Sequence, residues 1–204
     1  MLTRLQGLFE EICQSLSVEQ LYHSCDDLLM SLKADPQPAE QVRASARAAR
    51  AYLAPELARQ AVPGPREAAT VGLKCLAAGM LSGLLDGVLL YTEGQPPDAF
   101  RPEVDGKLRD KAEVMAGNLE DIVRVAQQNW ARSDADSLQL LSGYGRHENR
   151  LSDQEALALA ASPGLSLFEF QTFLLATFKG GYAMGMADAA VVFVAGERPG
   201  QAPE

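Results

Sequence analysis

The chain is short of aromatic residues, of cysteine and of positive charge, and each shortage excludes a class of protein. Aromatic residues make up only 6% of the sequence, whereas alanine is abundant, which favours helices over sheets. The formal net charge of -9 disfavours binding to nucleic acid or to an anionic membrane, because both need a basic surface. The three cysteines form no CxxC pair, so we expect reduced thiols in a cytoplasm rather than a disulfide or zinc framework.

Motifs with a recognised chemical mechanism are missing as well. The sequence contains no glycine-rich phosphate loop, no metalloprotease helix motif and no calcium-loop pattern. Its first residues include Arg4, Glu10 and Glu11 and no long apolar run, so we expect no secretory signal. These absences argue against an enzyme, and we expect neither a cofactor nor a metal.

The chain does contain a long internal repeat. The segment 67–94 aligns without a gap on the segment 169–196, at an offset of 102 residues. Shorter matches at offsets of 100 and 101 link the segments that precede these two. We therefore expect a tandem duplication, with one helical repeat at 1–99 and a second at 100–199 fused into one core, followed by a disordered tail at 200–204. The repeated pairs include Glu67/Glu169, Gly79/Gly181, Gly83/Gly185, Asp86/Asp188 and Gly94/Gly196.

The repeated glycines predict how the two long helices pack. An interior glycine costs a helix about 1 kcal/mol relative to alanine, so it is expected where another backbone comes close. We expect an all-α helical bundle whose two long central helices cross at their glycines near a pseudo-two-fold axis. Steps of four and three residues place two glycines and an aspartate on one face of each helix: Gly79, Gly83 and Asp86 in the first, and Gly181, Gly185 and Asp188 in the second.

Caps and breaks outline the shorter helices. Apolar stripes predict helices over 3–15, 18–32 and 39–53, and Pro55 is expected to kink or restart the third. In the second half, helices are expected over 107–116 and 119–130, with shorter ones before the second long helix. Gly94 fits the C-cap of the first long helix, and Ser166 with Glu169 forms a capping box that opens the second.

Asp86 and Asp188 are the leading candidates for a ligand-binding site. A carboxylate on a small, apolar helix face is costly to bury unless it is paired or hydrogen-bonded. Two such groups near a two-fold axis could share a proton, bind a cation or hold a polar ligand. The alternative is structural: each carboxylate pairs with a basic residue or accepts hydrogen bonds from another helix.

Arg43, Arg47 and Arg50 are candidates for a partner-binding surface, because they fall on one face of the helix expected over 39–53. Such a row can contact an acidic partner or a phosphate. It can equally be a solvated face, here with Glu40 just before Arg43.

Two other polar clusters carry less functional signal. His23, Cys25, Asp26 and Asp27 have metal-binding side chains, but their spacing fits no zinc pattern and Cys25 lies on an apolar stripe. The polar segment 146–149 contains a lone histidine and has no specified nucleophile, so a connecting loop is the simpler interpretation.

The sequence favours a non-enzymatic, protein-binding or adaptor domain in the cytoplasm, whose partner is another protein or a second copy of itself. One alternative is a small-molecule or metal-binding protein or an enzyme, with a site around Asp86 and Asp188 at the repeat interface. A second is a membrane-associated helical protein. The charges of Lys74 and Asp86 in the first long helix, and of Lys179 and Asp188 in the second, argue against membrane insertion.

Overall fold

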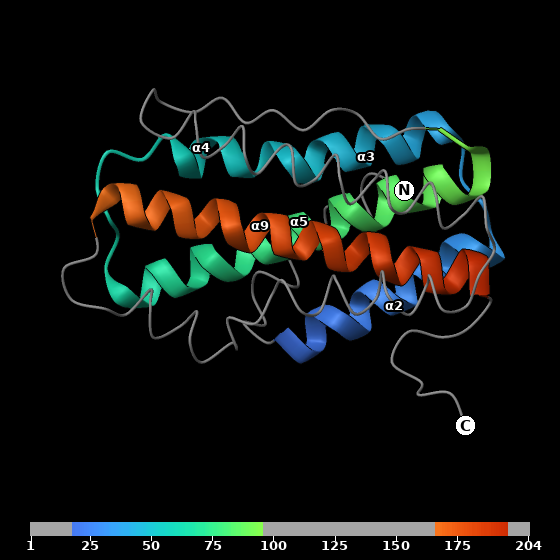
Figure 1. Cartoon of the computed structure of the whole chain (residues 1–204), viewed down its shortest axis with the longest axis horizontal. Helices are drawn as coiled ribbons and strands as arrows, with labels where there is room; N and C mark the ends of the chain where they lie inside the picture. The colour runs from blue at the N-terminus through green and yellow to red at the C-terminus, as the bar shows by residue number, and fades with distance from the viewer. Residues whose placement is uncertain (1–17, 96–165, 196–204) are drawn as a thin grey trace.

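A computed structural model describes residues 18–95 and 166–195, which form helices and their connections (Figure 1). These two ranges contain no strand, as expected of an all-α protein. Several predictions lie outside the described residues: the helices expected over 3–15 and within 107–161, the polar segment 146–149, and the tail at 200–204.

Helix α2 (Val18–Ala34) leads through a proline-containing turn to α3 (Ala39–Ala51) and the short α4 (Leu53–Leu57). The sequence predicts that Pro55 kinks or restarts the third helix, and the helix is interrupted at Tyr52 and restarts as α4, which contains Pro55. A proline ring clashes with the carbonyl group four residues earlier, which here belongs to Ala51, the last residue of α3. In the first turn of α4 the missing proline N–H costs nothing, since that donor has no partner within the helix.

The two long helices are α5 (Pro65–Glu93) and α9 (Leu167–Ala190), which continues as a single π-helical segment, η1 (Val191–Ala195). The predicted C-cap of α5 is confirmed: Gly94 adopts the left-handed conformation with φ of 64°, and its N–H donates to the Leu90 carbonyl oxygen at 3.1 Å. The predicted capping box of α9 is confirmed too, because Ser166 and Glu169 exchange both bonds.

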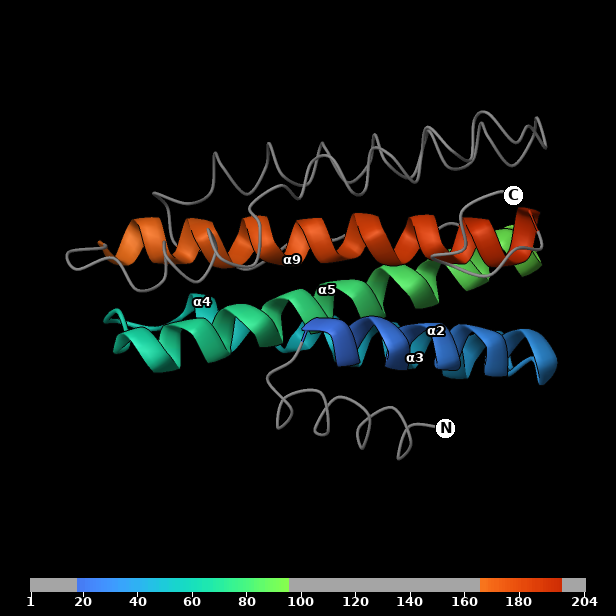
Figure 2. The ribbon, with the colours of Figure 1, turned by 90° about the horizontal axis from the view of Figure 1, so that it is seen from below.

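α5 and α9 lie side by side, run in the same direction and cross along their length (Figures 1 and 2). Their mutual contact is the most extensive in the described part of the chain. α3 runs antiparallel along α5, and α2 packs against α5 and the C-terminal part of α9. Burying a large apolar side chain contributes about 1.5–3 kcal/mol, so the side chains buried between these helices contribute much of the stability of the fold. Its largest fully buried side chains are Leu21, Leu29, Leu53, Met80, Leu84, Leu85, Leu89, Leu90, Phe170 and Phe178.

By length and composition, residues Glu67–Glu93 of α5 could also cross a membrane. In the folded chain, however, 83% of the most apolar window of this helix is buried inside the protein. Apolar residues surround α5 on all sides because α2, α3 and α9 cover it from different directions. The composition of α5 is therefore accounted for by its central position.

Candidate functional site at the crossing of α5 and α9

The glycines of α5 lie where the backbone of α9 comes closest. A Cβ atom built on Gly79 would overlap the backbone carbonyl oxygen of Phe178, and one on Gly83 would overlap that of Tyr182. Both neighbours are main-chain atoms of a helix, which cannot move aside as the end of a flexible side chain can. Only glycine therefore fits at these two positions without separating the helices.

The glycines of α9 make the corresponding contacts with α5. A Cβ on Gly181 would overlap the carbonyl oxygen of Leu76, and one on Gly185 would overlap that of Met80. Leu76 and Met80 stand 102 residues before Phe178 and Tyr182, which is also the spacing between the paired glycines. The contacts are therefore reciprocal: Gly79 contacts Phe178, and Gly181, which aligns with Gly79, contacts Leu76, which aligns with Phe178.

Asp86 lies in α5, one turn beyond Gly83, and only 1% of its surface is exposed. Its Oδ2 atom forms an ion pair with Nη1 of Arg50 in α3, at 2.5 Å. The hydroxyl of Tyr182 in α9 donates a hydrogen bond to the same oxygen at 2.9 Å. Nη1 of Arg50 also donates to the hydroxyl of Ser82, one turn before Asp86, at 3.1 Å. This polar cluster joins α3, α5 and α9.

Burial makes the Asp86 cluster sensitive to the loss of any member. The Arg50 side chain is only 9% exposed, so water could replace little of the negative charge and hydrogen bonding that Asp86 provides to the guanidinium group. Removing one partner of a buried ion pair commonly costs about 3–5 kcal/mol, because the other charge is left buried and uncompensated. Asp86 therefore acts chemically as an internal anchor for the guanidinium group.

Asp188 has different surroundings, although the two segments align it with Asp86. It is half-buried, and it lies near Cys25 of α2. Burial, followed by the charges of Asp188 and Asp26, raises the pKa of the Cys25 thiol well above its ordinary value. The thiol therefore stays protonated near neutral pH and is a poor nucleophile or metal ligand.

The predicted arginine row on α3 does not form one surface. Arg47 is exposed, whereas half-buried Arg43 donates from Nη2 to the Gln95 side-chain oxygen at 2.6 Å. Arg50 points inward and forms the ion pair with Asp86. The three residues span an arc of the helix, and the long Arg50 side chain reaches the interior from the edge of that arc.

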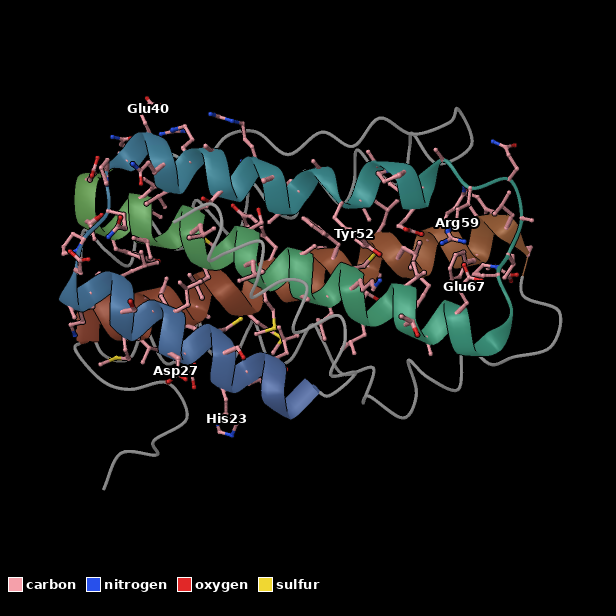
Figure 3. All side chains as sticks on the ribbon, turned by 180° about the vertical axis from the view of Figure 1, so that it is seen from behind. His23, Asp27, Glu40, Tyr52, Arg59 and Glu67 are labelled. Carbon is pink, nitrogen blue, oxygen red and sulfur yellow. The ribbon has the colours of Figure 1, made fainter. Side chains whose placement is uncertain are left out.

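The remaining metal-capable cluster is also divided. His23 and Asp27 are exposed on the outer side of α2 (Figure 3), whereas Cys25 is 1% exposed and faces the core. Among the residues that the structure describes, no group of three or more His, Cys, Asp and Glu side chains is arranged to hold a metal ion.

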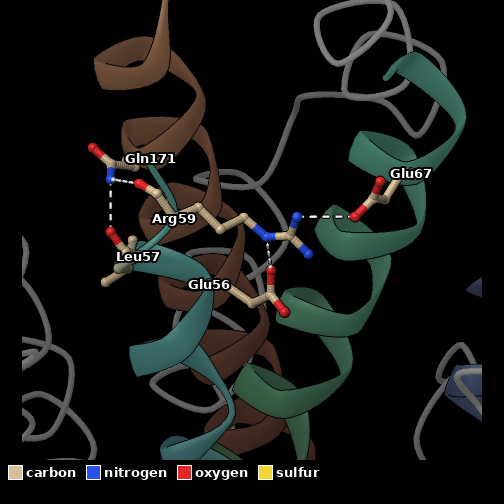
Figure 4. Close-up of polar contacts among 5 residues, drawn as sticks. All are labelled: Glu56, Leu57, Arg59, Glu67 and Gln171. Carbon is tan, nitrogen blue, oxygen red and sulfur yellow. Dashed lines mark hydrogen bonds and ion pairs between the residues drawn. The ribbon is translucent and has the colours of Figure 1, made fainter. Parts of the chain in front are cut away.

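Sequence reasoning missed two of the polar residues that join the helices. Tyr182 is the partner of Asp86 from α9, and a hydroxyl inside an apolar run is the signal that could have identified it. Gln171, buried in α9, donates to the carbonyl oxygens of Leu57 at 2.6 Å and Arg59 at 3.3 Å (Figure 4). It thereby satisfies backbone acceptors at the end of α4 and joins α4 to α9.

A second ion-pair cluster lies beside that junction (Figure 4). Arg59 contacts Glu56 at 2.5 Å and Glu67 at 2.9 Å, linking the end of α4 to the first turn of α5. Glu67 is exposed, so this cluster contributes less to stability than the buried Asp86 pair.

Comparisons of the chain with protein-family models, with curated proteins and with solved structures found no match.

Proposed function

We propose that the chain is a non-enzymatic, protein-binding domain of the adaptor type, built from two fused helical repeats, 1–99 and 100–199, whose long helices cross near a pseudo-two-fold axis. The reciprocal glycine contacts support the duplication, because Gly79 meets Phe178 as Gly181 meets Leu76. A shared ancestor of the two halves explains why aligned glycines contact aligned residues of the opposite helix. The crossing then serves as a rigid core that presents the outer helices to a partner.

The use of Asp86 inside the protein is the observation that carries this proposal. A catalytic or ligand-binding carboxylate must reach the ligand, whereas Asp86 is 1% exposed and engaged by Arg50 and Tyr182. The most site-like residue of the sequence therefore has a structural role. Recognition of another protein or a second copy then falls to exposed surfaces such as the outer side of α3 around Arg47.

Buried reduced thiols support a cytoplasmic location for this domain. Cys25 and Cys75 are both buried, as is typical of core thiols in a reducing compartment. The membrane-associated alternative has weaker support, because the membrane-length helix is used as the core of the fold.

A small-molecule or metal site near Asp188 is the competing proposal, and the partial exposure of this residue favours it. A ligand can reach a half-buried carboxylate, whereas it cannot reach the buried Asp86 carboxylate. This site would use Asp188 alone of the two repeated aspartates.

The test measures partner binding and ligand binding on the same full-length variants. Crosslinking and mass spectrometry identify a partner, and calorimetry with the purified partner gives a Kd. We expect Asp188→Asn to keep that Kd within about twofold, as should the exposed control Asp27→Asn. We also expect thermal unfolding to be unchanged by divalent metals and by a panel of charged metabolites. A ligand that stabilises the wild-type chain and Asp27→Asn, but not Asp188→Asn, would overturn the adaptor proposal in favour of the site.

A further inference from the structure

The two long helices end in different ways, although their sequences are aligned repeats. α5 provides its own cap, because Gly94 turns left-handed and returns hydrogen bonds to the preceding turn. α9 instead widens into the π-helical segment Val191–Ala195. It has no basic residue in its last turn to offset the partial negative charge of the C-terminal carbonyl groups. Within the described residues, α9 and η1 therefore supply no cation of their own to these carbonyl groups.

Lys33 of α2 supplies a cation at this end. Its Nζ atom donates a hydrogen bond to the carbonyl oxygen of Val192 at 2.8 Å, across 159 residues of sequence. Figures 1 and 2 place the C-terminal ends of α2 and α9 at the same end of the molecule. An ammonium group on a C-terminal carbonyl group satisfies that acceptor and also opposes the helix dipole. The Val192 side chain is fully buried, so the contact fixes a turn that belongs to the core.

A second contact shows that Lys33 lies at one end of a longer interface between α2 and the C-terminal part of α9. The hydroxyl of Tyr22, near the start of α2, donates to the sulfur of Met184 at 3.6 Å. Tyr22 and Lys33 are 11 residues apart, or about 16 Å along a helix. α2 is thus attached to the C-terminal part of α9 at two separated points, of which only the Lys33 contact reaches the π turn.

We propose that Lys33 is a latch that keeps the π turn at Val191–Ala195 ordered only while α2 is docked and the ammonium is charged. The described residues of α9 and η1 supply no basic side chain to these carbonyl groups, so the cation comes from another helix. Because Lys33 is exposed on the protein surface, an event on the outside of α2 is transmitted to the end of α9. The latch is independent of the identity of any partner.

Hydrogen–deuterium exchange of the full-length chain tests the latch. Removing the charge with Lys33→Met is expected to accelerate amide exchange in peptides covering 188–195 by about 2- to 30-fold, the range equivalent to a helix-terminus charge. Peptides covering Gly79–Leu85 of the crossing should be unchanged. Lys33→Arg, which keeps the charge and the donors, should exchange like the wild type.

Tyr22→Phe is the matched control, because it removes a hydrogen bond between α2 and α9 that lies away from the π turn. It should leave exchange in 188–195 within about twofold of the wild-type rate. Unchanged exchange in Lys33→Met would overturn the latch, as would equal acceleration of 188–195 and Gly79–Leu85, which indicates a general loss of stability. Acceleration in Tyr22→Phe equal to that in Lys33→Met would also overturn it, because the whole interface would then be responsible.

Discussion

Asp86 and Asp188 occupy equivalent positions in two aligned helices, yet they meet different neighbours. Asp86 is buried against Arg50 and Tyr182, whereas Asp188 is half-buried near Cys25. The contrast shows that the aligned sequences of two helices determine where a side chain lies relative to the helix crossing. It does not fix which partner the side chain finds, because the partner comes from the neighbouring helix. The stability of the fold should therefore depend unequally on the two halves.

The largest expected effect comes from removing the cation of the buried pair. Arg50→Met leaves the Asp86 carboxylate buried without its ion partner and should lower the free energy of unfolding by about 3–5 kcal/mol. Equilibrium denaturation by urea measures the loss. The double variant Arg50→Met/Asp86→Leu removes both charges and should regain much of the stability. A double variant less stable than Arg50→Met would show that the cost is not that of an unpaired charge.

The next effect tests the close contact of the two helices. Gly83→Ala places a methyl group against the Tyr182 carbonyl oxygen and should cost roughly 3 kcal/mol, the upper range for overpacking a core. Gly72→Ala in the same helix is the matched control, since its Cβ meets only the edge of the Phe173 ring, at 2.8 Å. This control should cost roughly 1 kcal/mol or less, and similar losses in both variants would argue against a main-chain crossing at Gly83.

A smaller loss is expected from the second partner of Asp86. Tyr182→Phe keeps the ring in the core and removes one hydrogen bond to a charged acceptor, which is worth about 2 kcal/mol. The ion pair with Arg50 remains. Denaturation of Tyr182→Phe in the Arg50→Met background should show coupling between the two sites. Strict additivity of the two losses would mean that they do not share the same carboxylate oxygen.

The smallest effect concerns a hydroxyl that is present in one of the two aligned segments and absent from the other. Tyr91 is buried, its hydroxyl has no hydrogen-bond partner among the described residues, and burial raises its pKa. Its repeat counterpart is Phe193. Tyr91→Phe should therefore be neutral or stabilise the fold by up to about 1 kcal/mol, because it removes a buried polar group. A measured loss above about 1 kcal/mol would reveal a partner for this hydroxyl.

Local features of the fold could be predicted from the sequence because their causes are local. Gly94 and the Ser166 capping box act within one turn, and both are where the sequence places them. The interruption after α3 lies upstream of Pro55 because the proline ring clashes with the carbonyl group four residues before it. The inward turn of Arg50 could not be predicted, because it depends on the antiparallel packing of α3 along α5, which no pattern within α3 specifies.

Unfolding of Asp86→Asn and Asp188→Asn, measured side by side in urea, tests most directly whether the two repeated aspartates have different roles. Replacing Asp86 leaves Arg50 buried without its counter-charge, so we predict a loss of about 3–5 kcal/mol. Replacing half-buried Asp188 should cost about 1 kcal/mol or less. Equal losses, or a larger loss in Asp188→Asn, would contradict the account.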